Sequence, residues 1–242
     1  MNAAVVTVGD ELLVGDTENT NATWLCDRLD ERGVTVRRVT VVPDEVSEIA
    51  RVVNEYHAEY DAVVVTHRHP DHFDEAAAAE LDADVPLFCQ PAEEDAFVED
   101  GFTDVRPVEE TASFDGVTLR RTPGRHGHGE LAEQMGPVSG FVFEGAETLY
   151  LAGDTVWYEP VAETLARFEP DAVVLNGGAA RFNEGEPITM GVDDVTAVRE
   201  ATDAAVAVVH MEAINHCLLS REELRAETED VLVPEDGERI EF

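Results

Sequence analysis

Apolar and polar residues follow two different periodicities along the chain, and the changes between them predict its secondary structure. Runs of β-branched residues at 3–8, 34–42 and 61–66 predict buried strands. Between these runs, apolar residues at helical spacing predict helices at about 22–32 and 44–60. This β-α-β-α-β order is typical of a parallel sheet with crossover helices.

Further along the chain the pattern changes to short strands separated by turns, and then to helices between buried strands. The expected strands are 85–89, 104–108, 111–114, 117–122, 138–144, 147–152, 171–176, 205–210, 230–233 and 238–242, and the expected helices are 73–81, 91–100, 160–168, 192–202 and 220–228. The strands between 104 and 152 suit one sheet of a sandwich, and Ser220 is the expected N-cap of the last helix.

One stretch, DAVVVTHRHPDH at 61–72, concentrates polar chemistry at the end of a predicted strand. Its candidate metal ligands are His67, His69, Asp71 and His72. Imidazoles and a carboxylate are costly to crowd together unless a divalent metal shares their lone pairs. Pro70 keeps the segment out of a helix, so these side chains can fan out from a loop. A solvated histidine-rich turn or a tag is the alternative, but a tag would lie at a terminus, without a buried strand before it.

Three further signals follow predicted strands downstream. They are GRHGHG at 124–129, Asp154 at the end of LAGD, and His210 followed by His216 in HMEAINH. Each alone is weak, because a glycine–aspartate pair is usually a turn and a histidine after a strand is more often structural. Together with the first stretch they contain seven of the eight histidines, all except His57, and they strengthen the prediction of a metal site.

The composition adds charge to this picture. The chain has 242 residues, enough for one large or two small domains, its net charge is −37, and all 16 of its basic residues are arginine. Without lysine it can have no Schiff-base or phosphate-loop lysine, and such acidity opposes binding to nucleic acid or an anionic membrane. We interpret the charge as a solvated surface suited to high salt, as in a halophilic protein; an acidic patch for a basic partner is the alternative.

The cysteines bear on the cellular compartment. Cys26, Cys89 and Cys217 are isolated and odd in number, so they predict neither a disulfide framework nor a CxxC pair. This usage fits a reducing cytoplasm. The sequence shows no signal peptide and no apolar run of membrane-spanning length, so we expect a soluble cytoplasmic protein.

From about residue 61 to 242 the sequence resembles the metallo-β-lactamase-fold hydrolases, near the branch of the ascorbate-6-phosphate lactonases. The resemblance rests on the histidine-rich stretch and on GRHGHGE, MGPVSGFVF, LYLAGDTVWY, PDAVVLNGGAARF, PITM and HMEAINHC. It implies two metal ions, the first held by His67, His69 and His126, the second by Asp71, His72 and His210, with Asp154 bridging both. The spacing alone does not decide between His126 and His128.

The activity implied by this resemblance is hydrolysis. Two divalent ions would lower the pKa of a shared water and present hydroxide to an ester, lactone or phosphoester, while one ion stabilises the developing oxyanion. The implied catalytic residues are Asp71, which would steer the nucleophile or pass a proton, and His216, which would support a ligand or face the substrate rather than bind metal itself. Ligands of this type suit zinc, and also manganese or iron. In a chain without lysine, an anionic small-molecule substrate would need Arg125, Arg181, backbone N–H groups or the metals.

Residues 1–66 resemble a different family, the molybdopterin-binding domain of competence/damage-inducible proteins, through TVGDELL, Gly15 and NTN at 19–21. In that family the strand DAVVVT would lead into a Gly-Gly-x-Gly-Pro loop that binds an anion by backbone amides, whereas here His67 follows the strand. The implied fold is α/β: an αββα metallo-β-lactamase-like sandwich whose first portion is replaced by a βαβαβ molybdopterin-binding-like unit. The implied domains are 1–60 and 61–242.

The two resemblances meet at the strand 61–66, and three functional hypotheses remain open. The first is a metal-dependent hydrolase. The second is a pterin- or nucleotide-binding module in which the ligand lies near Gly9, Asp10, Glu11 and Asn19, and the third is a catalytically inactive fusion. An N-terminal unit that completes the sheet would leave the hydrolase site intact, whereas poor packing would expose sheet edges and favour a homo-oligomer or aggregation.

Overall fold

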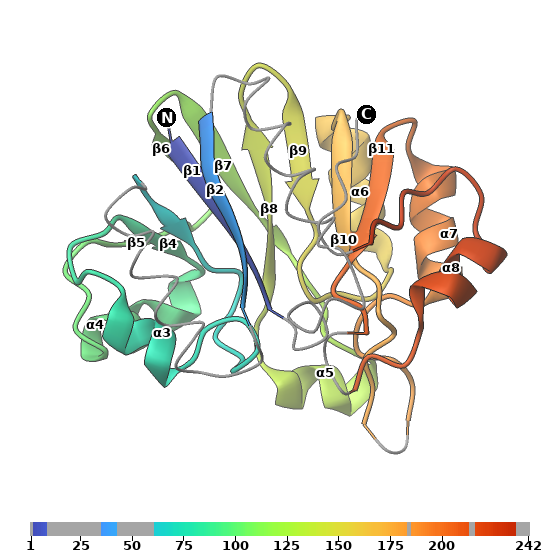
Figure 1. Cartoon of the computed structure of the whole chain (residues 1–242), viewed down its shortest axis with the longest axis horizontal. Coiled ribbons are helices and arrows are strands. Elements are labelled where there is room, and N and C mark those ends of the chain that lie inside the picture. The colour runs from blue at the N-terminus through green and yellow to red at the C-terminus, as the bar shows by residue number, and fades with distance from the viewer. Residues whose placement is uncertain (1, 9–34, 43–60, 183–184, 213–215, 236–242) are drawn as a thin grey trace. The chain divides into compact units, whose positions relative to one another are not determined.

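The structure, a computed structural model, describes residues 2–8, 35–42, 61–182, 185–212 and 216–235 (Figure 1). These residues belong to two compact units. The first contains the described residues up to Glu109 together with Glu235, and the second contains those from Glu110 to Pro234. The helices expected at about 22–32 and 44–60 and the strand expected at 238–242 lie outside the described residues, and the predicted domain boundary after residue 60 stays a prediction.

Two long strands of the first unit form a parallel pair. β1 (Asn2–Val8) and β2 (Thr35–Val42) correspond to the strands predicted at 3–8 and 34–42. Their register runs from Asn2 opposite Thr35 to Val8 opposite Val42, with one shift between Ala3 and Ala4. Parallel pairing is the arrangement that the predicted β-α-β order favours.

A second parallel sheet in this unit has the order β3 (Val63–Val64), β4 (Leu87–Cys89), β5 (Val105–Pro107). The helix α3 (Glu75–Glu80) connects β3 to β4, and the short turn η2 (Pro91–Glu93) and α4 (Glu94–Glu99) connect β4 to β5. The strand predicted at 61–66 is shorter than expected, because the chain leaves the ladder after the N–H of Val65 bonds the carbonyl of Phe88. The grouping of 104–108 with the later strands was wrong: β5 follows a crossover helix and returns parallel to β4.

Aromatic packing holds the core of the first unit together. Phe73, Phe97 and Phe102 are buried and lie edge to face, with ring centroids 5.0 to 6.2 Å apart. Aliphatic side chains surround these rings: Val65, Ala77, Leu81, Val85 and Leu87. Because Phe73 comes directly after the histidine-rich stretch, its burial fixes the point where that stretch ends.

In the second unit the described residues form one six-stranded sheet with the order β11-β10-β9-β8-β7-β6. The strands are β6 (Thr111–Phe114), β7 (Val117–Pro123), β8 (Ser139–Glu144), β9 (Thr148–Leu151), β10 (Ala172–Asn176) and β11 (Ala205–Val209). Neighbours from β6 to β9 are antiparallel, and β9, β10 and β11 are parallel. Since β7, β9, β10 and β11 therefore run in one direction, their carboxyl ends lie at one edge of the sheet.

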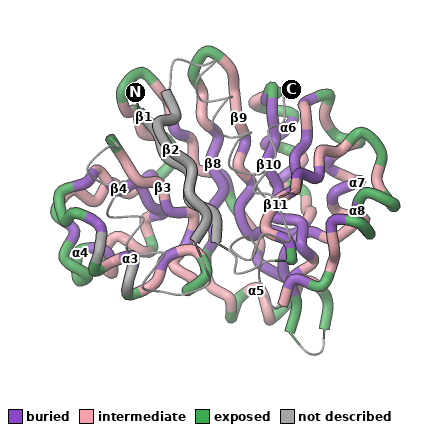
Figure 2. The backbone as a smooth tube through the Cα atoms, in the orientation of Figure 1, coloured by how far each residue is buried: buried purple, intermediate pink, exposed green. Residues whose placement is uncertain are grey.

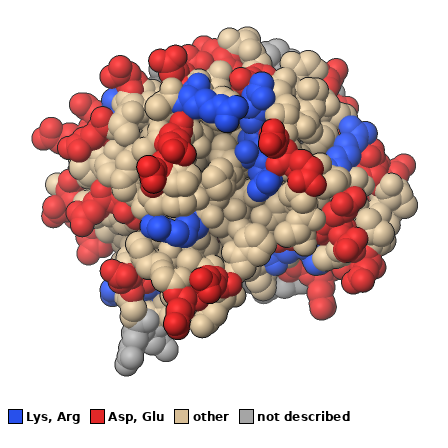
Figure 3. All heavy atoms as spheres, turned by 180° about the vertical axis from the view of Figure 1, so that it is seen from behind, with Lys and Arg blue, Asp and Glu red and all other residues tan. Residues whose placement is uncertain are grey.

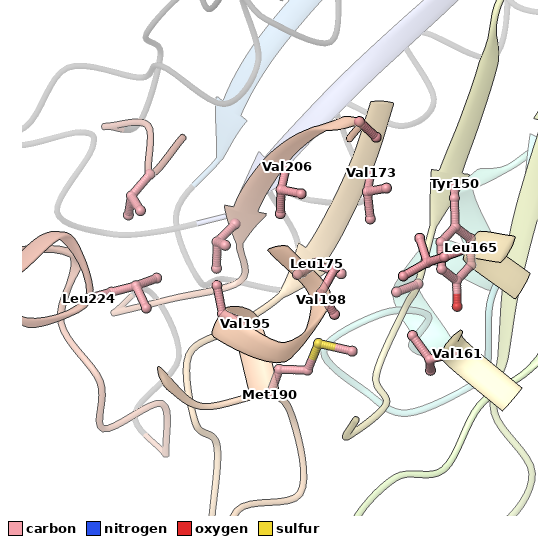
Figure 4. Close-up of a cluster of buried hydrophobic side chains, with 14 of the residues drawn as sticks. Tyr150, Val161, Leu165, Val173, Leu175, Met190, Val195, Val198, Val206 and Leu224 are labelled. Carbon is pink, nitrogen blue, oxygen red and sulfur yellow. The ribbon is translucent and has the colours of Figure 1, made fainter. Parts of the chain in front are cut away.

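Three of the four described helices of this unit cover the parallel strands. The helices are α5 (Gly129–Met135), α6 (Glu159–Phe168), α7 (Val192–Ala201) and α8 (Arg221–Glu227). Apolar side chains of α6, α7 and α8 form one buried cluster with β10 and β11 (Figure 4): Val161, Leu165, Val173, Leu175, Val195, Val198, Val206, Val208 and Leu224. Every residue of β10 is buried, as expected of a covered parallel strand (Figure 2).

Most elements of the second unit were predicted, and one was missed. Ser220 is the N-cap of α8 and forms a capping box with Glu223, as its sequence position indicated. The helix α5 was not predicted, because it is only seven residues long and lies between glycines that are more typical of turns. The predicted strand 230–233 is reduced to a single parallel bridge between Leu232 and Ala207. Among the described residues, no helix is long and apolar enough to cross a membrane.

The tight fit of β8 against its neighbours gives a testable prediction. A Cβ atom on Gly140 would lie 2.6 Å from the hydroxyl of Thr122 and 2.7 and 2.8 Å from the carbonyl oxygens of Leu151 and Ala152. Gly140→Ala should therefore lower the free energy of unfolding by about 1–3 kcal/mol, measured by chemical denaturation. Gly145→Ala is the matched control, since its Cβ would meet its nearest neighbour at 3.8 Å. Equal denaturation midpoints for the two variants would contradict this packing.

Candidate metal centre

The histidine-rich stretch forms a loop directly after β3 in the first unit. The carbonyl of His69 accepts hydrogen bonds from the N–H groups of His72 and Phe73 at 2.9 and 2.8 Å, which folds the stretch into a tight turn. The ring centroid of His67 lies 4.5 Å from that of His69 and 4.1 Å from that of His72. Nε2 of His72 is 3.8 Å from a carboxylate oxygen of Asp71. The predicted ligands of this stretch are thus gathered on one short loop.

Helices on either side hold this loop. Beyond its end, Asp74 caps α3 by accepting the N–H of Ala77 at 2.7 Å. Within the loop, the N–H of Arg68 donates to Oε1 of Glu93 at 2.9 Å. Burial raises the pKa of the Glu93 carboxyl, while hydrogen bonds from Arg68 and Gln90 oppose that rise. The loop is therefore attached at two points to elements that flank it.

Among the described residues of the first unit, cysteine does not compete as a metal ligand. Cys89 ends β4 and is fully buried. Burial, reinforced by the charges of Glu93 and Glu94, raises the pKa of its thiol to about 12. Because only the thiolate is a good metal ligand, a thiol that stays protonated at neutral pH is inert.

In the second unit the candidate ligands follow strands that run in one direction. His126 comes shortly after β7, Asp154 after β9, and His210 directly after β11. Asn176 is the last residue of β10, which lies between β9 and β11. The edge of a sheet where carboxyl ends of parallel strands meet is the usual place for a ligand site, and the sheet order brings these side chains to it.

Asp154 is the residue that the others of this unit face. Its carboxylate is 2% exposed, and Oδ1 accepts a hydrogen bond from the amide of Asn176 at 2.6 Å. Nε2 of His126 lies 3.5 Å from Oδ2, and Nε2 of His210 lies 3.9 Å from Oδ1. Metal–nitrogen and metal–oxygen bonds are each about 2 Å long, so ligand atoms at these separations can share one ion. His126, Asp154 and His210 are all among the residues that could hold a metal ion.

The tautomer of His126 fits that role. Nδ1 of His126 lies 2.7 Å from the carbonyl oxygen of Ile188, which can only accept a hydrogen bond. Nδ1 is therefore the protonated nitrogen, and in the neutral ring Nε2 presents its lone pair toward Asp154. A ring nitrogen hydrogen-bonded to a backbone carbonyl is the common support of a metal-binding histidine. The donor set of this unit thus suits a divalent cation.

His210 is aimed by a closely packed backbone. It has a positive φ of 60°, unusual for a residue with a side chain. The thiol of Cys217 lies 3.5 Å from its carbonyl oxygen and 3.7 Å from its Nδ1. The chain after β10 passes so near that a Cβ on Gly178 would lie 2.4 Å from the same carbonyl oxygen. The position of the imidazole therefore depends on glycine at 178.

The remaining predicted residues occupy distinct places. His128 is the N-cap residue of α5, so it is His126 that faces Asp154. His216 is half-buried, and its carbonyl accepts the N–H of Arg181, whose side chain is exposed. The guanidinium of Arg125 lies over the ring of Tyr158, 4.6 Å from its centroid.

Arg125 joins two ligand segments of the second unit. Its N–H donates to the hydroxyl of Thr155 at 2.9 Å, its carbonyl accepts from Val156, and its guanidinium donates to the carbonyl of Trp157 at 3.4 Å. These contacts tie the segment of His126 to the segment of Asp154. Arg125, one of the groups that the sequence offered for a substrate anion, is thus already engaged within the protein.

Sequence reasoning missed the residues that support the ligands. Asn176 was taken as the end of a buried strand, although a polar amide at the close of the run AVVLN was a signal of a role there. Ile188 acts through its backbone carbonyl, which no residue type reveals. Cys217 was treated only as an isolated cysteine.

Comparison with known proteins divides the chain. Residues 4–90 match the family model described as a probable molybdopterin binding domain. The CinA-like protein of Citrifermentans bemidjiense is 46% identical over 66 residues, which are 27% of this chain and 16% of that protein. The chain therefore spans less than a fifth of that relative.

The larger part of the chain is similar to other proteins. UPF0173 protein YddR of Bacillus subtilis is 39% identical over 193 residues, 75% of this chain and 76% of that protein. A possible metal-dependent hydrolase from Veillonella parvula has 36% identity and a TM-score of 0.72, covering 78% of this chain and 79% of that one. An isothiocyanate hydrolase from Delia radicum gut bacteria has 34% identity and a TM-score of 0.71, covering 87% and 82%. The metallo-beta-lactamase fold protein YhfI of Bacillus subtilis, 12% identical with a TM-score of 0.58 over 78% and 82% of the two chains, shows the fold alone.

The hydrogen bond between Asn176 and Asp154 predicts an effect on metal affinity. Asn176→Ala removes the donor that orients the carboxylate, so we expect zinc affinity to fall about 10- to 100-fold, measured by competition with a chelating indicator. Thr164→Val is the control, because it removes another hydrogen bond of a buried side chain in the same unit, to the carbonyl of Pro160 in α6. Equal losses of affinity in the two variants would contradict a specific role for Asn176.

Proposed function

The chain belongs to the UPF0173 family, and from that premise we propose that it hydrolyses an ester, lactone or phosphoester bond with the help of two divalent metal ions. It has the metallo-β-lactamase fold and is a metal-dependent hydrolase. The observation that carries the proposal is the buried carboxylate of Asp154, which Asn176 holds and which the Nε2 atoms of two histidines face.

We assign the predicted ligands to two ions. The first would be held by His67, His69 and His126, the second by Asp71, His72 and His210, and Asp154 would bind both. The residue types support this assignment, because imidazole and carboxylate are the ligands that zinc takes in catalytic sites, and manganese and iron accept them too. Their burial also supports it, since the side chains of His67, His126 and Asp154 are all nearly inaccessible to water. Zinc is the metal we propose.

Bound ions of this kind would lower the pKa of a water so that hydroxide is available at neutral pH. The chain's own residues then have separate tasks. Asp71 is exposed on its loop and is placed to hold or pass a proton at its carboxylate. Asn176 keeps the carboxylate of Asp154 in one orientation. We propose that His216, half-buried beyond β11, contacts the substrate.

The charge of the protein limits what the substrate can be. Acidic side chains lie mainly around the margin of the face drawn in Figure 3, with arginines across its upper middle, and the net charge of the chain is −37. Such a surface repels polyanions, so we propose a small-molecule substrate, no nucleic-acid or membrane partner, and a cytoplasmic protein adapted to high salt. The candidate substrates to be tested include an isothiocyanate, because one structural neighbour is named as an isothiocyanate hydrolase.

A second candidate function is binding of a pterin or nucleotide by the N-terminal segment. The match of residues 4–90 to the molybdopterin-binding model favours it. The residues expected near such a ligand, Gly9, Asp10, Glu11 and Asn19, lie outside the described residues. Against it stands His67, which occupies the place of the first glycine of the anion-binding loop.

Calorimetric titration of the full chain with a pterin tests this second candidate. If the segment binds pterin, heat is released in proportion to the protein; no heat at high micromolar pterin would end the candidate. Zinc is added in a parallel titration, so that pterin bound directly by metal is recognised.

Elemental analysis tests the main proposal. Protein purified in high salt without added metal should carry about two divalent ions per chain, and His126→Ala and Asp154→Ala should lose them together with hydrolysis of an ester, lactone, phosphoester or isothiocyanate. His57→Ala, the histidine outside the predicted set, should keep both metal and activity.

Two outcomes would count against this proposal. Unchanged hydrolysis in Asp154→Ala would show that the reaction does not use these ligands. Near-zero metal that added zinc cannot restore would instead favour the inactive fusion.

A further inference from the structure

Arg68 lies between two proposed ligands, and its side chain is directed away from them. We propose that Arg68 is a positioning residue, which fixes His67 and His69 by anchoring their loop to α4. This inference rests on the proposed function, because it gives the anchored loop its role in metal binding.

The two faces of the loop have different partners. The rings of His67 and His69 lie edge to face with their centroids 4.5 Å apart, so these two side chains share one side of the loop. The guanidinium of Arg68 instead lies over the rings of Phe97 and Phe73, 5.0 and 5.9 Å from their centroids. One face of the loop thus presents imidazoles, and the other is packed on the aromatic core.

Polar contacts tie Arg68 to both ends of one helix. Its N–H donates to Glu93, the residue directly before α4. Its guanidinium pairs with the carboxylate of Asp100, the C-cap residue of α4. The backbone of Arg68 is therefore held at one end of α4 and its side chain at the other, and the two contacts together restrain the segment 67–69.

The energetics favour a role in geometry over one in global stability. A partly exposed ion pair adds about 0–1 kcal/mol to folding, and the side chains of Arg68 and Asp100 are 29% and 28% exposed. Ligands of a metal site, by contrast, must be held to within about 0.5 Å of their productive positions. A planar guanidinium can stack on aromatic rings while its N–H groups bind a carboxylate, which an ammonium group does less well.

The first unit provides a matched control in Arg106. This arginine of β5 forms two hydrogen bonds with Asp104, at 2.8 and 2.7 Å, and lies over the ring of Phe88 at 5.4 Å. Its side chain is 38% exposed. The chemistry is that of Arg68, an arginine on a carboxylate and an aromatic ring, but Arg106 lies on a strand that carries no proposed ligand.

The test compares Arg68→Met, Arg68→Lys and Arg106→Met in the full chain. Zinc dissociation constants are measured by competition with a chelating indicator, thermal unfolding is measured on the metal-free proteins, and visible absorption is recorded with cobalt in place of zinc. We expect Arg68→Met to weaken zinc binding about 10- to 100-fold and to change the cobalt spectrum, and Arg106→Met to stay within about twofold of the unchanged protein. The zinc affinity of Arg68→Lys should lie between those of the two methionine variants. The metal-free forms of all three variants should have the same melting temperature.

Each contrary result has a distinct meaning. Zinc affinity in Arg68→Met equal to that in Arg106→Met would overturn the positioning role. If Arg68→Met does not fold, Arg68→Lys decides, and zinc affinity unchanged in that variant would overturn the inference. If the protein without any substitution binds no zinc, the proposed function itself is overturned, and the positioning role with it.

Discussion

A buried carboxylate is the constraint on which the site of the second unit depends. Asp154 is 2% exposed, and removing an ionised carboxylate from water costs several kcal/mol unless hydrogen bonds and positive charge compensate for it. Asn176 supplies a hydrogen bond, and the Nε2 atoms of His126 and His210 each lie near a different oxygen of the carboxylate, where bound cations would supply the charge. The sheet meets this constraint by ending β7, β9, β10 and β11 at one edge, so that a short segment after each strand can contribute.

The candidate ligands were predictable from sequence because each lies at or just after the end of a predicted strand. Histidines after DAVVVT and an aspartate after LYLAG contrast sharply with the residues before them. Their supports were not predictable in the same way. In the sequence, Asn176 is only the last residue of a predicted strand, and Ile188 contributes a backbone carbonyl, which every residue has. The choice between His126 and His128 required the geometry around Asp154.

For the fold, too, the local sequence pattern predicted where strands lie but not which strands pair. Short apolar and β-branched segments between turns located β7, β8, β10 and β11, but the pattern of residues 104–108 did not reveal that β5 would pair with β4. That pairing follows from the crossover helix between the two strands, which is a property of the chain's path. The predicted changeover near residue 61 lies within the range 4–90 that matches the molybdopterin-binding model, and β3 is a short parallel strand of the kind that either architecture accepts.

The closeness of Gly178 to the carbonyl of His210 limits how this protein can evolve. A methyl group 2.4 Å from that oxygen would force the backbone to move, and with it the residue that aims one imidazole at Asp154. Selection for the site therefore acts on a position whose residue has no side chain and is not a proposed ligand. Among descendants of this gene, the codon for residue 178 should drift only between synonymous glycine codons, while the codons of exposed neighbours change freely.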